Sequence, residues 1–391
     1  MSKTKSPLSP PSSIEPLPTQ PSSQNETPQS RNFDRRSFLK NSMVAGAVAS
    51  VGAGVLAGAT PAFADQGKGK GKDQGTQSGS LSQGDIAILR FLAAAEILET
   101  DLWDQYAELG GVTASNPYAT ALSNLDGDGQ QYITSNTLDE QSHANFLNAY
   151  LKSKGAPIVN LNKFKTLPSS KATGAKQIGR LTNLMQLTVD TSWYTRYRSR
   201  QNPDFGATFP QAINLVDLPG IPRDDSDFGP KNHVQAIANT AAFHFGTIEQ
   251  GGSTLYSAMA QKASNLEVLR IVLSIGGDEV AHFLEWVDFA GNGVSTPIAP
   301  FTDPTNGLTF PDFNATHNPL LQTNLIFPVP CQFIDKSLPH CAVIRPTAPD
   351  GIAAGVVSFL TAMGLFIGQS SAFFDALNAL ASAADAAQRD M

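Results

Sequence analysis

The chain has 391 residues and a formal net charge of −7, so its length allows two or three average domains. A chain this acidic is a poor partner for nucleic acid or for anionic membrane surfaces, and we expect it to bind neither. The need for solubility accounts for the charge by itself.

The first 64 residues have the pattern of an export signal. Residues 1–30 are rich in Pro, Ser and Gln and have too few apolar residues to fold. Arg35 and Arg36 precede an apolar run, which ends at Ala62-Phe63-Ala64, a typical cleavage site. The twin arginines resemble a Tat signal, although Asp34 stands where such signals usually have Ser or Thr. The resemblance implies export of the folded chain by the Tat translocase to the periplasm or the medium. The alternative is an uncleaved N-terminal anchor.

The first helix follows a flexible linker over residues 65–82, which is rich in Gly, Lys, Ser and Gln. This helix is predicted to begin near Gln83 and to end at Gly110-Gly111, because glycine favours a helix C-cap. Glu96 lies in its apolar stripe, and Trp103 follows on the same face. A buried carboxylate without a partner is costly, so Glu96 needs one.

The second helix is predicted over residues 131–154, with Glu140 and His143 on its apolar face. Residues 116–130, which precede it, are predicted to form a loop. The fragment Asp126-Gly-Asp128-Gly could bind calcium but lacks the rest of the required spacing. A plain turn is the other interpretation.

An insertion, residues 156–230, separates the second helix from the third. Residues 175–200 are predicted to form an amphipathic helix that covers the bundle, with its arginines paired to surface aspartates. Its aromatic residues alternate with arginines and could stack on bases. The acidic chain and the export signal argue against that interpretation.

The third and fourth helices repeat the pattern of the first two. The third helix, over residues 234–262, has Glu249 in its apolar stripe, and the fourth, over residues 266–290, has Glu279 and His282. The four helices therefore offer, in order, Glu, Glu-x-x-His, Glu and Glu-x-x-His. In carboxylate four-helix bundles, two helices each give one Glu and two each give a Glu-x-x-His to a pair of metal ions.

On these motifs the chain resembles the ferritin-like superfamily, and especially its desiccation-related and stress-induced secreted members. The resemblance covers residues 83–290 and implies an all-α fold, a ferritin-like four-helix bundle with a long insertion between its second and third helices. The insertion argues against a cage-forming storage subunit.

The resemblance also implies a dinuclear centre of two iron ions, or of manganese, that reacts with dioxygen or peroxide. The predicted metal ligands are Glu96, Glu140, His143, Glu249, Glu279 and His282. Glu140 and Glu279 are the expected bridges. Glu99 is an auxiliary ligand or a partner of a ligand. Trp103 and Tyr256 flank the site, in either a packing or a redox role.

Residues 291–350 are predicted to be rich in loops, because residues 292–350 contain ten prolines. Segments 324–329 and 341–345 are β-prone and could form a small strand pair. Cys331 and Cys341 are expected to form a disulfide, as cysteines of exported proteins commonly do. A zinc site beside His340 is the alternative.

Residues 351–391 are predicted to form a C-terminal helix, because residues 351–374 are apolar and carry no charge. Packing on the bundle as a fifth helix is one interpretation. A transmembrane helix, favoured by the length and by the Gly364-x-x-x-Gly368 motif, is the other.

Three functions fit these residues. The first is a di-iron oxidase or peroxidase, and the second is manganese-dependent peroxide dismutation. The third is a non-enzymatic stress or desiccation protein with a weak or vestigial metal site. The complete set of predicted ligands favours the first two.

Overall fold

The computed structural model describes residues 81–389, apart from 199–208, 317–334, 336 and 343–349. The predicted export signal and residues 65–80 of the predicted linker lie outside these residues. The described part is mainly helical with two short antiparallel strand pairs, which confirms the predicted all-α fold. Its four longest helices are α2 (Gln83–Gly110), α4 (Gly129–Ser153), α6 (Lys231–Ala260) and α7 (Leu266–Gly293).

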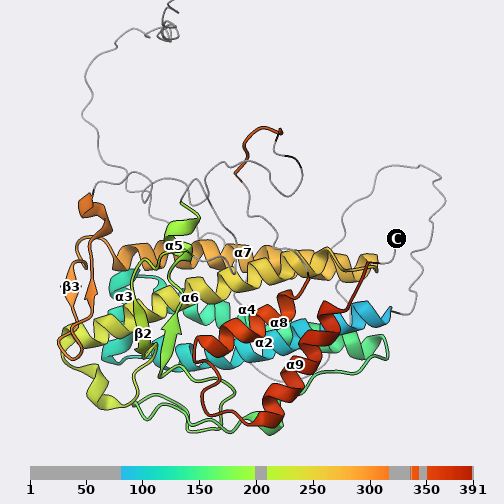
Figure 1. The fold of residues 1–391 in the computed structure, drawn as a ribbon. Coiled ribbons are helices and arrows are strands. Elements are labelled where there is room, and N and C mark those ends of the chain that lie inside the picture. Colours follow the sequence, from blue (N-terminus) through green and yellow to red (C-terminus); the bar gives the residue numbers. More distant parts are fainter. Residues whose placement is uncertain (1–80, 199–208, 317–334, 336, 343–349, 390–391) are drawn as a thin grey trace, which may run out of the picture. The chain divides into compact units, whose positions relative to one another are not determined.

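The bundle consists of two helical pairs, α2 with α4 and α6 with α7 (Figure 1). Side-chain caps fix where two of these helices begin: Ser82 accepts a hydrogen bond from the Asp85 amide at 3.0 Å, and Asn265 accepts one from the Glu267 amide at 2.8 Å. The apolar stripe of each helix faces the common core. The four helices begin and end close to the residues predicted from the sequence.

The loop predicted over residues 116–130 contains a short helix, α3 (Pro117–Leu125). Asn116 caps it by accepting a hydrogen bond from the Ala119 amide at 2.9 Å, and Pro117 occupies its first turn. Between α3 and α4, the Asp126 carboxylate accepts a hydrogen bond from the Asp128 amide at 2.9 Å. The Asp-Gly-Asp-Gly fragment is therefore a turn that leads into α4.

The prediction of a single helix over residues 175–200 is wrong. The described part of the insertion contains α5 (Trp193–Arg196) and a strand pair, β1 (Leu187–Val189) with β2 (Leu215–Leu218). It also contains two 3₁₀ turns, η1 (Asn162–Phe164) and η2 (Asp225–Phe228). The Asp101 carboxylate on α2 accepts hydrogen bonds from the Leu181 and Thr182 amides at 2.9 and 3.0 Å. These backbone donors are thus satisfied without a helix.

The described arginines of the segment predicted as a helix, Arg180, Arg196 and Arg198, are buried, so their predicted pairing with surface aspartates is also wrong. Arg180 forms an ion pair with Glu108 at 2.5 Å, and Arg196 donates to the Gln250 side chain at 2.5 Å. The Trp193 ring lies against Gly246, where an added Cβ would come within 2.3 Å of it. The insertion thus helps to cover α6, in which every residue over 233–250 is buried.

The C-terminal part of the described chain contains more and shorter elements of secondary structure than predicted. It begins with the strand pair β3 (Phe301–Thr302) and β4 (Thr309–Phe310) and the 3₁₀ turn η3 (Phe313–Thr316). Segment 324–329 and residues 343–345 of the other predicted strand lie outside the described residues. The single helix predicted over residues 351–391 is instead two helices, α8 (Ile352–Ala362) and α9 (Ser371–Asp385).

The Gly364-x-x-x-Gly368 motif separates α8 from α9. Both glycines have positive φ, +89° and +92°, which residues with a Cβ adopt only at a cost. α8 packs on α6, and α9 packs on α2 (Figure 1). Of the helices that the structure describes, none has both the length and the apolar character needed to span a bilayer.

Candidate metal centre

The four helices bring together all six residues predicted as metal ligands. Their carboxylates and imidazoles meet inside the bundle, where the four glutamates are fully buried and the exposed fractions of His143 and His282 are 8% and 5%. α2 and α6 each contribute one glutamate, and α4 and α7 each contribute a glutamate and a histidine. Their role as ligands stays a prediction.

The first group consists of Glu96, Glu140, His143 and Glu279, each with a ligand atom within 4.8 Å of the others. The Nδ1 atom of His143 lies 3.2 Å from Glu140 Oε2 and 3.4 Å from Glu96 Oε2. It lies 3.8 Å from Glu279 Oε1. Three carboxylates and one imidazole thus surround one position that suits a cation.

The second group consists of Glu140, Glu249 and His282. His282 Nδ1 lies 3.1 Å from Glu140 Oε1 and 3.3 Å from Glu249 Oε2. Glu140 therefore directs one oxygen to each histidine, and the two imidazole centroids lie 6.4 Å apart. The two groups of possible ligands are therefore adjacent and share the Glu140 carboxylate.

Four buried oxygen atoms in this cluster accept no hydrogen bond from the described residues: Glu96 Oε2, Glu249 Oε2 and both oxygens of Glu279. A buried carboxylate without a partner is strongly unfavourable, and a bound cation removes that cost. Gly252 on α6 makes room for Glu279, because a Cβ there would lie 1.9 Å from Glu279 Oε2. The residues present therefore fit a metal centre.

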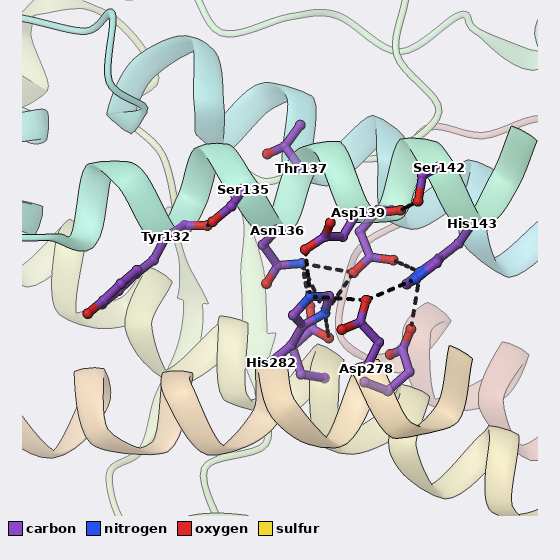
Figure 2. Close-up of polar contacts among 12 residues, drawn as sticks. Tyr132, Ser135, Asn136, Thr137, Asp139, Ser142, His143, Asp278 and His282 are labelled. Carbon is purple, nitrogen blue, oxygen red and sulfur yellow. Dashed lines mark hydrogen bonds and ion pairs between the residues drawn. The ribbon is translucent and has the colours of Figure 1, made fainter. Parts of the chain in front are cut away.

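Each histidine is oriented by an aspartate of the opposite helix (Figure 2). His143 Nε2 on α4 lies 3.1 Å from Asp278 Oδ2 on α7, and His282 Nε2 on α7 lies 3.3 Å from Asp139 Oδ2 on α4. Such partners fix the ring and its tautomer in metal sites. Sequence reasoning missed them, although each aspartate directly precedes the glutamate of its motif, which makes both motifs Asp-Glu-x-x-His.

Asn136 is a further contact that sequence reasoning missed. Its side-chain amide donates to Glu140 Oε1 at 2.8 Å, and its carbonyl oxygen accepts from the Trp286 indole at 2.6 Å. Figure 2 shows Asn136 directed towards His282. Asn136 lies four residues before Glu140 on the same helical face, and this spacing could have identified it as a neighbour of the cluster.

The two flanking aromatic residues both hydrogen-bond to a glutamate of the cluster. The Trp103 indole donates to Glu249 Oε1 at 3.0 Å, and the Tyr256 hydroxyl donates to Glu96 Oε1. Trp103 also stacks on Trp286 with ring centroids 5.3 Å apart. These aromatic side chains therefore orient the two single glutamates as well as filling the core.

Glu99 belongs to neither group among the described residues. It lines a pocket between α2 and α6 instead. Burial, together with the negative charges of Glu96 and Glu140, raises the pKa of Glu99 well above its ordinary value. Its predicted auxiliary role stays a prediction.

The pKa values in the cluster reflect four carboxylates held close together. Burial raises the pKa of Glu96 to about 7, and burial with the charge of Glu140 raises that of Glu279 well above its ordinary value. Burial lowers the pKa of His143, but the adjacent carboxylates of Glu140 and Glu96 outweigh it and raise the pKa to about 10. The pKa of His282 rises to about 12, because the charge of Glu249 outweighs burial. Protonated histidines thus balance part of the negative charge in the metal-free protein.

Two other histidines are buried away from the cluster. His233 lies between Asp227 and Asp303, at 3.1 and 2.9 Å. His244 contacts the Tyr106 hydroxyl at 2.8 Å, and burial lowers its pKa to about 3. Cys341 is exposed and bonded to no described cysteine, and Cys331 lies outside the described residues, so their disulfide stays a prediction.

A family model described as ferritin-like domain matches residues 84–286. The matched segment contains α4, α6, all but the first residue of α2, and the six predicted ligands. Comparisons with curated proteins and with solved structures gave no match.

Proposed function

This chain belongs to the ferritin-like domain family, and we propose that it holds two iron ions, with manganese as the alternative, in redox chemistry with dioxygen or peroxide. The observation that carries the proposal is the set of buried carboxylate oxygens beside two histidines, four of which accept no hydrogen bond from the described residues. A single cation would leave part of this negative charge uncompensated. Glu140, which belongs to both groups, supports a pair of ions.

The bound ions would supply one-electron exchange and open coordination positions for an oxidant. The protein residues would hold them. Glu140 and Glu279 would bridge, while Glu96 with His143 and Glu249 with His282 would complete the two positions. Asp278, Asp139, Trp103 and Tyr256 would keep those side chains oriented, as residues around metal sites commonly do.

We also propose that the protein acts outside the cytoplasm, on the strength of Arg35-Arg36 and the Ala62-x-Ala64 site. A role in stress protection is proposed from the resemblance to the stress-induced secreted members alone. Replacing both arginines with lysine should leave the precursor in the cytoplasm. Export at the normal rate would refute the Tat interpretation.

The central experiment compares His282→Ala with His233→Ala by elemental analysis and thermal melts with and without a chelator. Both variants remove a buried histidine that contacts carboxylates, but only His282 lies in the cluster. We expect about two metal ions per chain in the unmodified protein. His282→Ala should lose metal and the effect of the chelator on the melting temperature, because metal binding contributes to folding stability. His233→Ala should have a lower melting temperature than the unmodified protein but the same metal content. Absence of metal from the reconstituted unmodified protein would leave a non-enzymatic bundle as the better interpretation.

A further inference from the structure

Two buried arginines of the insertion lack a carboxylate partner among the described residues. Arg196, the last residue of α5, and Arg198, two residues later, have exposed fractions of 1% and 7%. The basic side chains that do form ion pairs there, apart from histidines, are Lys154, Lys176, Arg180, Arg223 and Lys262. Two positive charges are therefore buried close together without an opposite charge at ion-pair distance from the part of the chain that the structure describes.

The guanidinium group of Arg196 also has unused hydrogen-bond donors. Its Nη2 atom donates to the Gln250 side chain on α6 at 2.5 Å. Its Nε and Nη1 atoms are buried, and neither reaches an acceptor of the described residues. A guanidinium group holds an oxyanion along its Nε–Nη2 edge or its Nη1–Nη2 edge. Each of these edges of Arg196 thus keeps one free donor.

Arg198 has the same deficit. Its Nη1 atom donates to the Tyr194 carbonyl oxygen, and its guanidinium carbon lies 4.1 Å from the centroid of the Tyr194 ring. Its Nε atom is buried and has no acceptor within the described segments. Burial lowers the pKa of this guanidinium group. A neutral carbonyl and an aromatic face stabilise a cation less than a carboxylate does, so the charge of Arg198 adds to that of Arg196.

Arg180 shows how the same insertion buries an arginine that is fully paired. It is also 1% exposed, but it forms an ion pair with Glu108 at 2.5 Å. It also donates to the Ser169 hydroxyl at 3.0 Å and to the Lys176 carbonyl oxygen at 3.2 Å. A buried charge without a partner is strongly unfavourable. The comparison indicates that Arg196 needs an acceptor that carries a negative charge.

We propose that Arg196, with the charge of Arg198 close by, binds a small oxyanion: phosphate, sulfate or the carboxylate of a small organic acid. The free Nε and Nη1 donors of Arg196 would hold its oxygens, and its charge would balance the buried guanidinium groups. The partners of the two arginines are Gln250 and Tyr194, and none of the six predicted metal ligands is among them. The inference therefore does not depend on the proposed function.

The first test compares thermal melts in phosphate, sulfate and acetate with melts in chloride, after dialysis into chloride and at constant pH and ionic strength. The anions are used at low millimolar concentration, because higher concentrations of such salts stabilise proteins non-specifically. We expect at least one of them to raise the melting temperature by about 2–4 °C, since a ligand of the folded state stabilises it. The largest shift identifies a tetrahedral anion or a carboxylate as the ligand. Equal melting temperatures in all four salts would overturn the proposal.

The second test repeats these melts with variants. Arg196→Gln removes the charge but keeps an amide that can donate to Gln250, so the shift should be lost. Arg198→Gln removes the neighbouring charge and should reduce the shift. Arg180→Gln is the matched control: it leaves Glu108 unpaired, so its melting temperature in chloride should be lower, but its shift should equal that of the unmodified protein.

The variants also separate this site from the metal cluster. An anion bound at the cluster would give the same shift in Arg196→Gln and Arg198→Gln as in the unmodified protein, and that result would overturn the proposal. Loss of the shift in Arg180→Gln as well would overturn it too, because the effect would then follow general destabilisation. Elemental analysis should find the same metal content in Arg196→Gln and in the unmodified protein. Absence of metal from both would refute the proposed function and leave the anion result standing.

Discussion

The two sides of the bundle contribute to one site but differ in chemistry. On the α4–α7 side, two histidines contact the carboxylates, and the partly exposed aspartates Asp139 and Asp278 contact the histidines. On the α2–α6 side, each glutamate is held by a neutral aromatic donor, and the pocket between these helices is mainly apolar. Four similar helices thus form a site with one polar side, which carries the two histidines and their aspartates, and one apolar side.

This difference follows from short sequence changes at equivalent helical positions. α4 and α7 carry Asp-Glu-x-x-His, whereas the cluster glutamates of α2 and α6 have no histidine three residues later and are followed by an aromatic residue two turns on. The histidines need charged partners near solvent, while the aromatic donors satisfy their carboxylates inside the core. The comparison predicts which substitutions affect metal binding and how strongly.

The largest effect should come from Gly252→Ala, where the two sides meet. The added Cβ would overlap Glu279 Oε2, so the carboxylate must move and metal binding should be lost, as elemental analysis can measure. Gly251→Ala is the matched control, because its Cβ meets nothing within 4 Å. That control should keep its metal and gain about 0.5–1 kcal/mol in stability. Normal metal content in Gly252→Ala would contradict the placement of Glu279.

An intermediate effect is expected on the polar side. Asp278→Asn and Asp139→Asn should each weaken metal affinity about 10- to 100-fold, because the histidine rings lose the partners that orient them. Competition with a metal-sensitive chelator measures the affinity. Glu99→Gln, a similar change on the apolar side, should leave affinity nearly unaltered. If Glu99→Gln weakens binding as much as the aspartate variants do, Glu99 is a ligand after all.

The smallest effect is a change in how stability depends on pH. The pKa of His143 is raised from 6.5 to about 10 and that of Glu96 from 4.5 to about 7. Both raised values stabilise the metal-free protein at low pH, and this stabilisation is lost as the pH rises through the folded-state values. Metal binding requires deprotonated ligands, so its contribution to stability grows as the pH rises and opposes this loss. Between about pH 5 and pH 9, the melting temperature of the metal-free protein should therefore fall as the pH rises. The melting temperature of the metal-loaded protein should fall less over the same range, or rise. Equal slopes would argue against metal binding at these residues.

The sequence predicted the bundle and the six-residue cluster because both depend on helical periodicity. A glutamate or histidine in an apolar stripe must point into the core, whatever its tertiary neighbours are. Asn136 gave a weaker signal, because asparagine in a helix has many surface roles. The pairing of His143 with Asp278 could not be predicted from either motif alone, since it depends on how α4 and α7 lie side by side.

The errors outside the bundle have a different origin. Residues 175–200 have an apolar pattern compatible with a helix, but the Asp101 carboxylate on a distant helix satisfies the Leu181 and Thr182 amides. The apolar C-terminal segment has the composition of one helix, yet Gly364 and Gly368 adopt positive φ and end it. In both regions, hydrogen bonds or backbone angles set by the tertiary fold override the local pattern.

The crossed contacts of the two histidines link the site to the assembly of the fold. His143 belongs to the α2–α4 hairpin but is oriented by α7, and His282 belongs to the α6–α7 hairpin but is oriented by α4. Neither hairpin alone can position its imidazole. If the cluster binds metal as proposed, metal occupancy in a metal-saturated sample should also report the fraction of chains in which the two hairpins have docked in their native register.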